Sequence, residues 1–167
     1  MHSRQPWQIR QKVYAPNKSP NMKIIKNTFV LLLVCAAFSV SAQDATEKKA
    51  IEKAIMNYVN AFYEADTTKA YESIAKDLAK RGYYTTKEGS VAEAKMSFEQ
   101  LVRLAQRWKS TQTITAETPR KVTVFDVLDK IASAKVEAKW GIDYFHLAKV
   151  NGNWTIINVL WQDHPKK

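Results

Sequence analysis

The sequence predicts one α+β domain, in which helices cover one face of an antiparallel sheet. In the region from residue 44 to Trp108, apolar residues recur at helical spacing. Beyond Pro119 they alternate with a period of two, which is typical of strands. Asn151-Gly152 separates two apolar runs, and this pair is a strong hairpin signal because both residues tolerate positive φ.

The first 42 residues contain the pattern of an export signal. From Met22, a short basic start precedes an apolar run from Phe29 to Val40, and small residues follow up to Ala42. The run is shorter than the roughly 20 residues that span a bilayer. We therefore expect cleavage near Ala42, a periplasmic or extracellular protein and no stable membrane anchor. Residues 1–21 are expected to be an extension from a misplaced start, residues 22–42 the signal peptide and residues 43–167 a single domain.

Removal of residues 1–42 changes the charge and thiol content of the chain. The full sequence has a net charge of +10, but this segment holds six basic residues and no acidic one. The remaining 20 basic and 16 acidic side chains leave +4, which gives no case for nucleic acid binding. The only cysteine, Cys35, is also lost, which excludes disulfides and thiol chemistry. Val34 occupies the place of the small residue in a lipid-attachment box, so lipidation is not expected.

Three helices are predicted before Pro119. The first covers residues 44–64, with a buried stripe of Ile51, Ile55, Tyr58, Val59 and Phe62. The second begins at a capping Asp66 and ends at Gly82. The third begins with a capping box of Ser90 and Glu93, and its apolar face continues to Trp108.

Four strands are predicted after Pro119, at about 120–128, 131–140, 142–150 and 153–161. One face of the second strand is mostly small, and these side chains leave space for a cavity. It carries Ala132, Ala134, Val136, Ala138 and Trp140. The last strand is apolar on both faces, which predicts helices on one side of the sheet and a second subunit on the other.

Three stretches carry a family resemblance: Asp77–Gly82, Ile131–Val136 and Asp143–Trp161. With them, nearly all of residues 45–163 resembles the lumazine-binding branch of the nuclear transport factor 2-like (SnoaL-like) superfamily. The resemblance implies a cone of three N-terminal helices on a strongly curved antiparallel sheet of four to six strands, with an internal cavity. The fold hosts isomerases, dehydratases, polyketide cyclases and binding domains, so it does not specify the activity.

Enzymes of this fold use an acid or base on a strand and hydroxyl donors opposite, which makes Asp143 or His146 the candidate acid or base. Tyr58 and Tyr84 are the candidate donors. Strand parity places Asp143 and His146 on opposite faces, so both cannot line one cavity without a bulge. Each of these residues could instead have a role without chemistry. His146 could be a surface residue, Asp143 could end a turn, and Tyr58 could pack in the core.

The candidate ligand-binding residues are Tyr58, Phe62, Tyr84, Trp140 and Asn158. Asn158 shares the parity of Trp154 and Ile156, so an inward face would place its amide in a wet pocket or against a hydrogen-bond partner. No spacing for a metal site, glycine-rich phosphate loop or serine nucleophile elbow is present, and no cofactor or metal is expected.

Three functions remain open from the sequence. The first is an exported domain that binds a small aromatic or heterocyclic molecule in a mostly apolar pocket. The second is a cofactor-independent isomerase, cyclase or dehydratase that uses Asp143 or His146. The third is a structural module without a ligand. We expect a homodimer through the sheet in each case.

Overall fold

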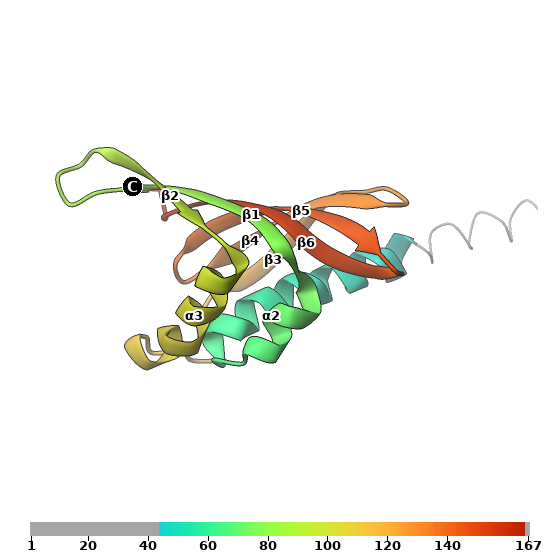
Figure 1. Ribbon diagram of the computed structural model, residues 1–167, viewed down its shortest axis with the longest axis horizontal. Helices are drawn as coiled ribbons and strands as arrows, with labels where there is room; N and C mark the ends of the chain where they lie inside the picture. Colours follow the sequence, from blue (N-terminus) through green and yellow to red (C-terminus); the bar gives the residue numbers. More distant parts are fainter. Residues whose placement is uncertain (1–43, 166–167) are drawn as a thin grey trace, which may run out of the picture. The chain divides into compact units, whose positions relative to one another are not determined.

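A six-stranded sheet is the centre of the computed structural model, which describes residues 44–165 (Figure 1). The strand order is β2-β1-β6-β5-β4-β3, and the sheet is open between β2 and β3. The strands are β1 (Ile74–Thr85), β2 (Val91–Met96), β3 (Arg120–Val127), β4 (Ile131–Ala138), β5 (Gly141–Val150) and β6 (Asn153–Gln162). Neighbours are antiparallel except β1 and β6, which pair in parallel. The predicted signal peptide and upstream extension lie outside the described residues.

Three helices lie against one face of this sheet, which confirms the predicted α+β class (Figure 1). The described chain begins in a helix that ends at residue 63, and α2 (Thr67–Ser73) and α3 (Phe98–Trp108) follow. A short 3-10 turn, Lys109–Thr111, extends α3. The predicted stripe of the first helix is buried, because Ile51, Ile55, Tyr58, Val59 and Phe62 all belong to the core.

The predicted second helix is wrong beyond residue 73. Asp66 does cap it, since its side chain accepts a hydrogen bond from the backbone N–H of Thr68. The chain then leaves the helix and forms β1, which lies between β6 and β2 and pairs with both. The pairing overrides the helix propensity of the alanines and lysines in this stretch.

The predicted start of the third helix is also wrong. Residues from Val91 to Met96 form β2, the antiparallel partner of β1, and Ser90 belongs to the turn between them. The observed capping box lies seven residues later, where Ser97 and Gln100 each bond the other's backbone N–H. From Phe98 to Trp108 the helix is as predicted.

The four strands predicted after Pro119 are confirmed as β3 to β6. Asn151 and Gly152 have φ values of 49° and 82°, and the flanking residues Val150 and Asn153 pair directly. Positive φ at both central residues is the geometry of a type I′ turn. This turn fixes the register of β5 against β6.

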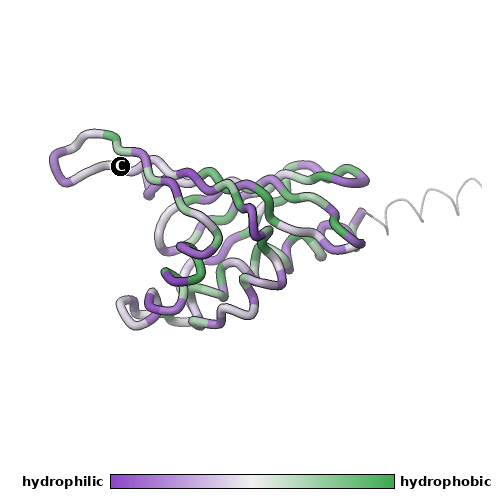
Figure 2. Tube along the Cα trace, viewed as in Figure 1, coloured by the Kyte–Doolittle hydropathy of each residue, from purple (hydrophilic) through white to green (hydrophobic). Residues whose placement is uncertain are grey.

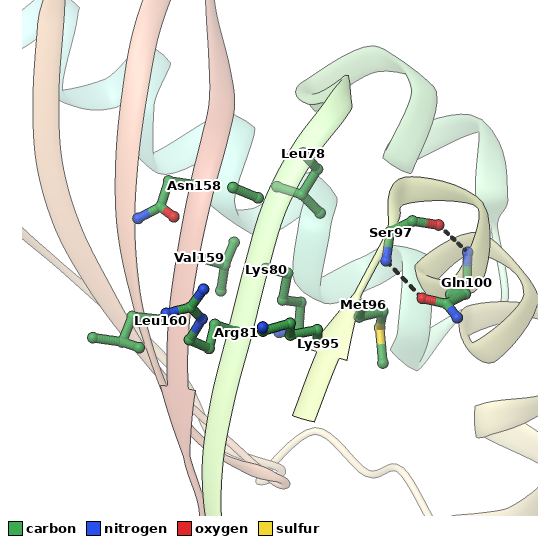
Figure 3. Close-up of a pocket in the computed structure, with 11 residues that line it drawn as sticks. Leu78, Lys80, Arg81, Lys95, Met96, Ser97, Gln100, Asn158, Val159 and Leu160 are labelled. Atoms are coloured by element: carbon green, nitrogen blue, oxygen red, sulfur yellow. Dashed lines mark hydrogen bonds between the residues drawn. The ribbon is translucent and has the colours of Figure 1, made fainter. Parts of the chain in front are cut away.

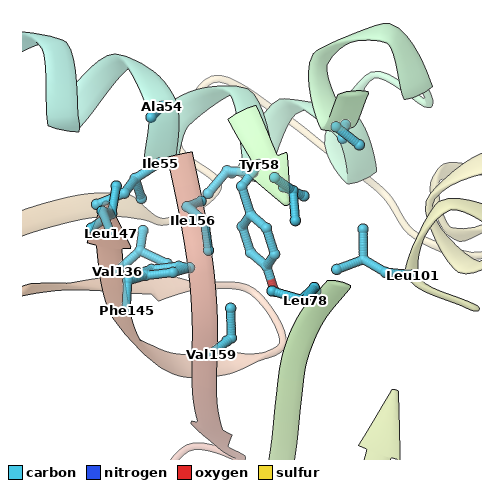
Figure 4. Packing of buried hydrophobic residues seen from close by; sticks show 14 of the residues in the cluster. Ala54, Ile55, Tyr58, Leu78, Leu101, Val136, Phe145, Leu147, Ile156 and Val159 are labelled. Atoms are coloured by element: carbon cyan, nitrogen blue, oxygen red, sulfur yellow. The ribbon is translucent and has the colours of Figure 1, made fainter. Parts of the chain in front are cut away.

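The core lies between the helices and the sheet. Figure 4 shows Tyr58 and Ile55 of the first helix among side chains of the sheet, including Phe145 and Ile156. Figure 2 shows hydrophilic residues at the turn between β1 and β2, away from this layer. The inward face of β4 consists of small residues and Val136, as predicted, but these side chains are packed in the core and do not line the aromatic cavity described below.

Candidate functional site

A buried carboxylate, Asp143, is the centre of the candidate site. The alternation of β5 points Asp143 inward together with Phe145 and Leu147, and Asp143 is 0% exposed. Its Oδ2 accepts hydrogen bonds from Trp140 Nε1 at 2.7 Å and from Tyr58 Oη at 3.2 Å. Its Oδ1 accepts one from Lys80 Nζ at 3.2 Å. The carboxylate is therefore held by three donors from three different elements.

Lys80 of β1 is the partner charge of Asp143. Its side chain is 6% exposed, and its Nζ also donates to Tyr58 Oη at 2.7 Å. Burial lowers the pKa of Lys80, while the negative charge of Asp143 opposes this change. Burial also raises the pKa of Tyr58 well above its ordinary value of 10.0, and Asp143 adds to this rise. Tyr58 therefore keeps its proton, and its hydroxyl group donates a hydrogen bond to the carboxylate of Asp143.

An aromatic cavity of about 110 Å³ lies next to this ion pair. Trp140 contributes to both features, because its N–H binds Asp143 while its ring lies 5.1 Å from that of Phe62 and 5.4 Å from that of Trp108. Among the described residues, Lys80 is the only charged one in the lining. The lining consists of Tyr58, Phe62, Lys80, Met96, Leu104, Trp108, Trp140 and Trp161.

Gly82 makes room for Trp161 in this wall. The two residues pair across β1 and β6, and a β-carbon at Gly82 would overlap the indole ring of Trp161. The ring of Trp161 lies with its centre 5.7 Å from Lys80 Nζ. On its other side it stacks on Tyr84, with ring centres 6.2 Å apart and planes 5° apart. Glycine at position 82 therefore fixes where the cavity wall lies.

A larger groove of about 610 Å³ adjoins the cavity, because Lys80 and Met96 line both (Figure 3). Figure 3 shows β1, β2 and the first turn of α3 around this groove, with the capping bonds between Ser97 and Gln100. Arg81 in its wall is paired with Glu93 at 3.0 Å. The side chain of Met96, which lines both spaces, is of a flexible type that adapts its conformation readily.

The structure separates the two predicted acid–base candidates. Asp143 faces inward, whereas His146 is exposed on the outer face, so the expectation from strand parity is confirmed. His146 Nδ1 lies 3.1 Å from the side-chain nitrogen of Asn158. These two residues form a pair away from the aromatic cavity, and Asn158 is also one of the residues that line the larger groove.

Asn158 does not face inward as its parity with Ile156 suggested. The pairing of β5 with β6 shifts between His146 and Leu147, so that Ile157 is an extra residue in β6. This bulge reverses the alternation, and Val159 takes the buried position instead. A bulge of this kind leaves no mark in the alternation of apolar residues, because β6 is apolar on both faces.

The other predicted binding residues divide into two groups. Tyr58, Phe62 and Trp140 line the cavity together. Tyr84 is 38% exposed and does not line the cavity. Its ring stacks on that of Trp161, which does.

Sequence reasoning missed Lys80, Met96, Leu104, Trp108 and Trp161 as lining residues. For Lys80, a signal was available in the sequence. Leu78, Lys80 and Gly82 are two residues apart, so in a strand their side chains share one face.

Within residues 44–165, no group of three or more histidine, cysteine, aspartate or glutamate side chains is placed to hold a metal ion. None of the helices in the same range has the length and apolar character needed to cross a membrane.

Comparisons with known proteins agree with this fold. The model of the family described as "Putative lumazine-binding" matches residues 46–162. No curated protein sequence matches the chain. Several solved structures are similar, among them nuclear transport factor 2-like proteins of unknown function from three bacteria.

The protein from Methylobacillus flagellatus is 23% identical, with a TM-score of 0.56 over 72% of this chain and 94% of its own. The protein from Silicibacter pomeroyi is 17% identical, with a TM-score of 0.56 over 72% and 98%. The one from Shewanella baltica is 18% identical, with a TM-score of 0.53 over 73% and 97%. At these identities the likeness establishes the fold alone.

Proposed function

The chain belongs to the putative lumazine-binding family of the nuclear transport factor 2-like superfamily, and on this premise we propose that it is an exported domain that binds a small aromatic molecule. The observation that carries the proposal is the cavity between helices and sheet. Five of its eight lining residues are aromatic, and one buried polar group, Lys80, borders it. Apolar walls with few placed polar groups are the usual composition of a small-molecule site.

The volume of the cavity limits the ligand. An apolar cavity of about 150 Å³ holds benzene, and this cavity measures about 110 Å³. This cavity is smaller than the one that holds benzene, so even a single substituted ring needs side chains of the lining to shift, and lumazine, with two fused rings, needs more room still. Binding of a bicyclic ligand requires Met96 or Trp108 to move outward.

A cavity-filling substitution tests this proposal. Leu104→Phe adds volume inside the cavity, and Leu128→Phe makes the same change at an exposed site. Titration calorimetry with one-ring aromatic compounds should give saturable binding for the wild type and for Leu128→Phe, and none for Leu104→Phe. If Leu104→Phe binds as well as the wild type, the ligand lies elsewhere.

Catalysis by Asp143 is the second candidate, because the predicted contact between an acid and a phenol is present at 3.2 Å. The carboxylate, however, already accepts from Trp140, Tyr58 and Lys80, and it is not part of the cavity lining. A base with its oxygens so occupied is poorly placed to take a proton from a bound molecule. The geometry therefore favours binding over proton transfer.

Export is proposed from the sequence pattern of residues 22–42. Mass spectrometry of the chain expressed in a bacterial host should find a mature N-terminus at Gln43 in the periplasm or medium. An intact chain that stays in the cytosol would contradict the proposal.

A second copy of the chain is the proposed partner of the outer sheet face. Exposed apolar side chains gather there, and the rings of Phe125 and Tyr144 stack with centres 5.7 Å apart. Light scattering should give a dimer mass for the wild type and for Val91→Lys, which changes an exposed residue of β2. Tyr144→Lys should give a monomer. A monomeric wild type would contradict the proposal.

A further inference from the structure

The ammonium group of Lys80 has one hydrogen-bond donor more than its protein partners use. A charged lysine carries three N–H donors. Two of them go to Tyr58 Oη and Asp143 Oδ1, and within residues 44–165 no third acceptor lies within hydrogen-bond distance. The side chain is buried and lines the aromatic cavity. A buried donor without an acceptor is costly, and an acceptor on a ligand would satisfy it.

The charge of the cavity restricts the kind of acceptor. Asp143 already neutralises Lys80 at 3.2 Å, and none of the other described lining residues carries a charge. The nearby Arg81 is paired with Glu93 and lines the groove instead. An anionic ligand would therefore leave one negative charge without a partner in an apolar site. A neutral acceptor avoids this cost.

We infer that the ligand is a neutral, one-ring aromatic compound with a carbonyl oxygen or ring nitrogen that accepts a hydrogen bond from Lys80 Nζ. This inference rests on the proposed binding function, because it assumes that the cavity admits an aromatic ring. The ring would lie among the indoles of Trp140 and Trp161, with its acceptor directed toward the ammonium group. Specificity then comes from one buried donor, and affinity for the ring comes from the walls.

Three probes of similar size test the inference on the wild-type protein. Toluene has the ring without an acceptor, benzamide adds a neutral carbonyl, and benzoate adds an anionic carboxylate. Binding is followed by the shifts of the indole N–H signals of Trp140 and Trp161 in NMR spectra. Because benzamide can accept a hydrogen bond from a charged donor and toluene cannot, benzamide should bind about tenfold or more tightly than toluene. Benzoate should bind more weakly than benzamide.

A double variant then assigns the preference to Lys80. Lys80→Met combined with Asp143→Asn removes the donor and its counter-charge together, so that no unpaired charge is left in the core. Benzamide affinity should fall to that of toluene, and toluene affinity should stay within about twofold of its wild-type value. Lys95→Met is the matched control, because Lys95 lines the groove but not the cavity. It should keep the wild-type preference.

The outcomes separate the inference from the proposed function. Equal binding of toluene and benzamide by the wild type, or tighter binding of benzoate, overturns the inference while the cavity remains a binding site. A folded double variant that still prefers benzamide also overturns it. If no probe shifts the indole signals, the proposed function fails together with the inference.

Discussion

At the scale of single residues, Lys80 and Asp143 control the polar end of the cavity. Solvent screens these two charges little, since both side chains are at most 6% exposed. Removal of one partner from a buried ion pair costs about 3–5 kcal/mol, because it leaves the other charge unpaired. Joint replacement of both partners is much less costly.

The first prediction concerns the coupling between these two residues. Lys80→Met should lower the free energy of unfolding by about 3–5 kcal/mol. Lys80→Met with Asp143→Asn should lower it by less than the sum of the two single effects. Urea denaturation of all four proteins gives the double-mutant cycle. Additive effects would mean that the two groups do not form the pair described above.

The second prediction concerns the alkaline pH range. The pKa of Tyr58 in the folded protein lies well above 10.0, so its contribution to stability is present below pH 10 and is lost as pH rises above it. Lys80 acts in the opposite direction, because its folded pKa lies below 10.5. Tyr58→Phe removes only the tyrosine contribution.

The difference in unfolding free energy between the wild type and Tyr58→Phe should therefore shrink between pH 9 and pH 11. Urea denaturation at several pH values measures it. A constant difference over this range would show that Tyr58 ionises equally well in the folded and unfolded chain.

At this scale the sequence pointed to Asp143 and to several aromatic residues of the site but missed Lys80, the partner charge of Asp143. Tyr58, Phe62 and Trp140 were candidate ligand-binding residues, and all three line the cavity. Lys80 was assigned to a helix, where a lysine before glycine has an ordinary capping role. Only the pairing of β1 with β6 brings its ammonium group to Asp143, 63 residues away along the chain.

At the scale of elements, β1 is the strand that assembles the site. It brings Lys80, Gly82 and Tyr84 to one face, in contact with Asp143 or Trp161. Local propensity favours a helix in this stretch, and the strand exists because two neighbours pair with it. The strand-period spacing of Leu78, Lys80 and Gly82 was outweighed by the helical propensity of the stretch, so β1 and β2 were not predicted, while β3 to β6 were.

The third prediction follows from the contact between β1 and β6. Gly82→Ala should push the Trp161 indole out of the cavity wall, because a β-carbon would overlap that ring. We expect a loss of about 1–3 kcal/mol in unfolding free energy, as for overpacked cores, together with weaker binding of aromatic ligands. Thermal unfolding and calorimetry measure the two effects.

Trp161→Ala provides the background that isolates this effect. In a protein without the indole, Gly82→Ala should cost much less than it does in the wild type. An equal cost in both backgrounds would show that the backbone at position 82, and not the ring contact, requires glycine.

At the scale of the whole domain, the sheet separates two surfaces with different roles. Its inner face and the helices enclose the core and the cavity, while its outer face carries the pair of His146 and Asn158 among exposed apolar residues. The α+β class was predictable because the helical period before Trp108 and the strand period beyond Pro119 occupy separate stretches of the sequence, although β1 and β2 lie among the helices. The parallel pairing of β1 with β6 could not be predicted, since the sequence of β1 has the propensity of a helix.

The most direct test of the central claim is the NMR response of the indole N–H groups to benzamide. Trp108, Trp140 and Trp161 line the cavity, whereas Trp154 binds Glu47 at a distance of 2.7 Å and does not line it. We expect saturable shifts for the three cavity indoles and none for Trp154. Unchanged cavity signals, or equal shifts of all four indoles, would contradict it.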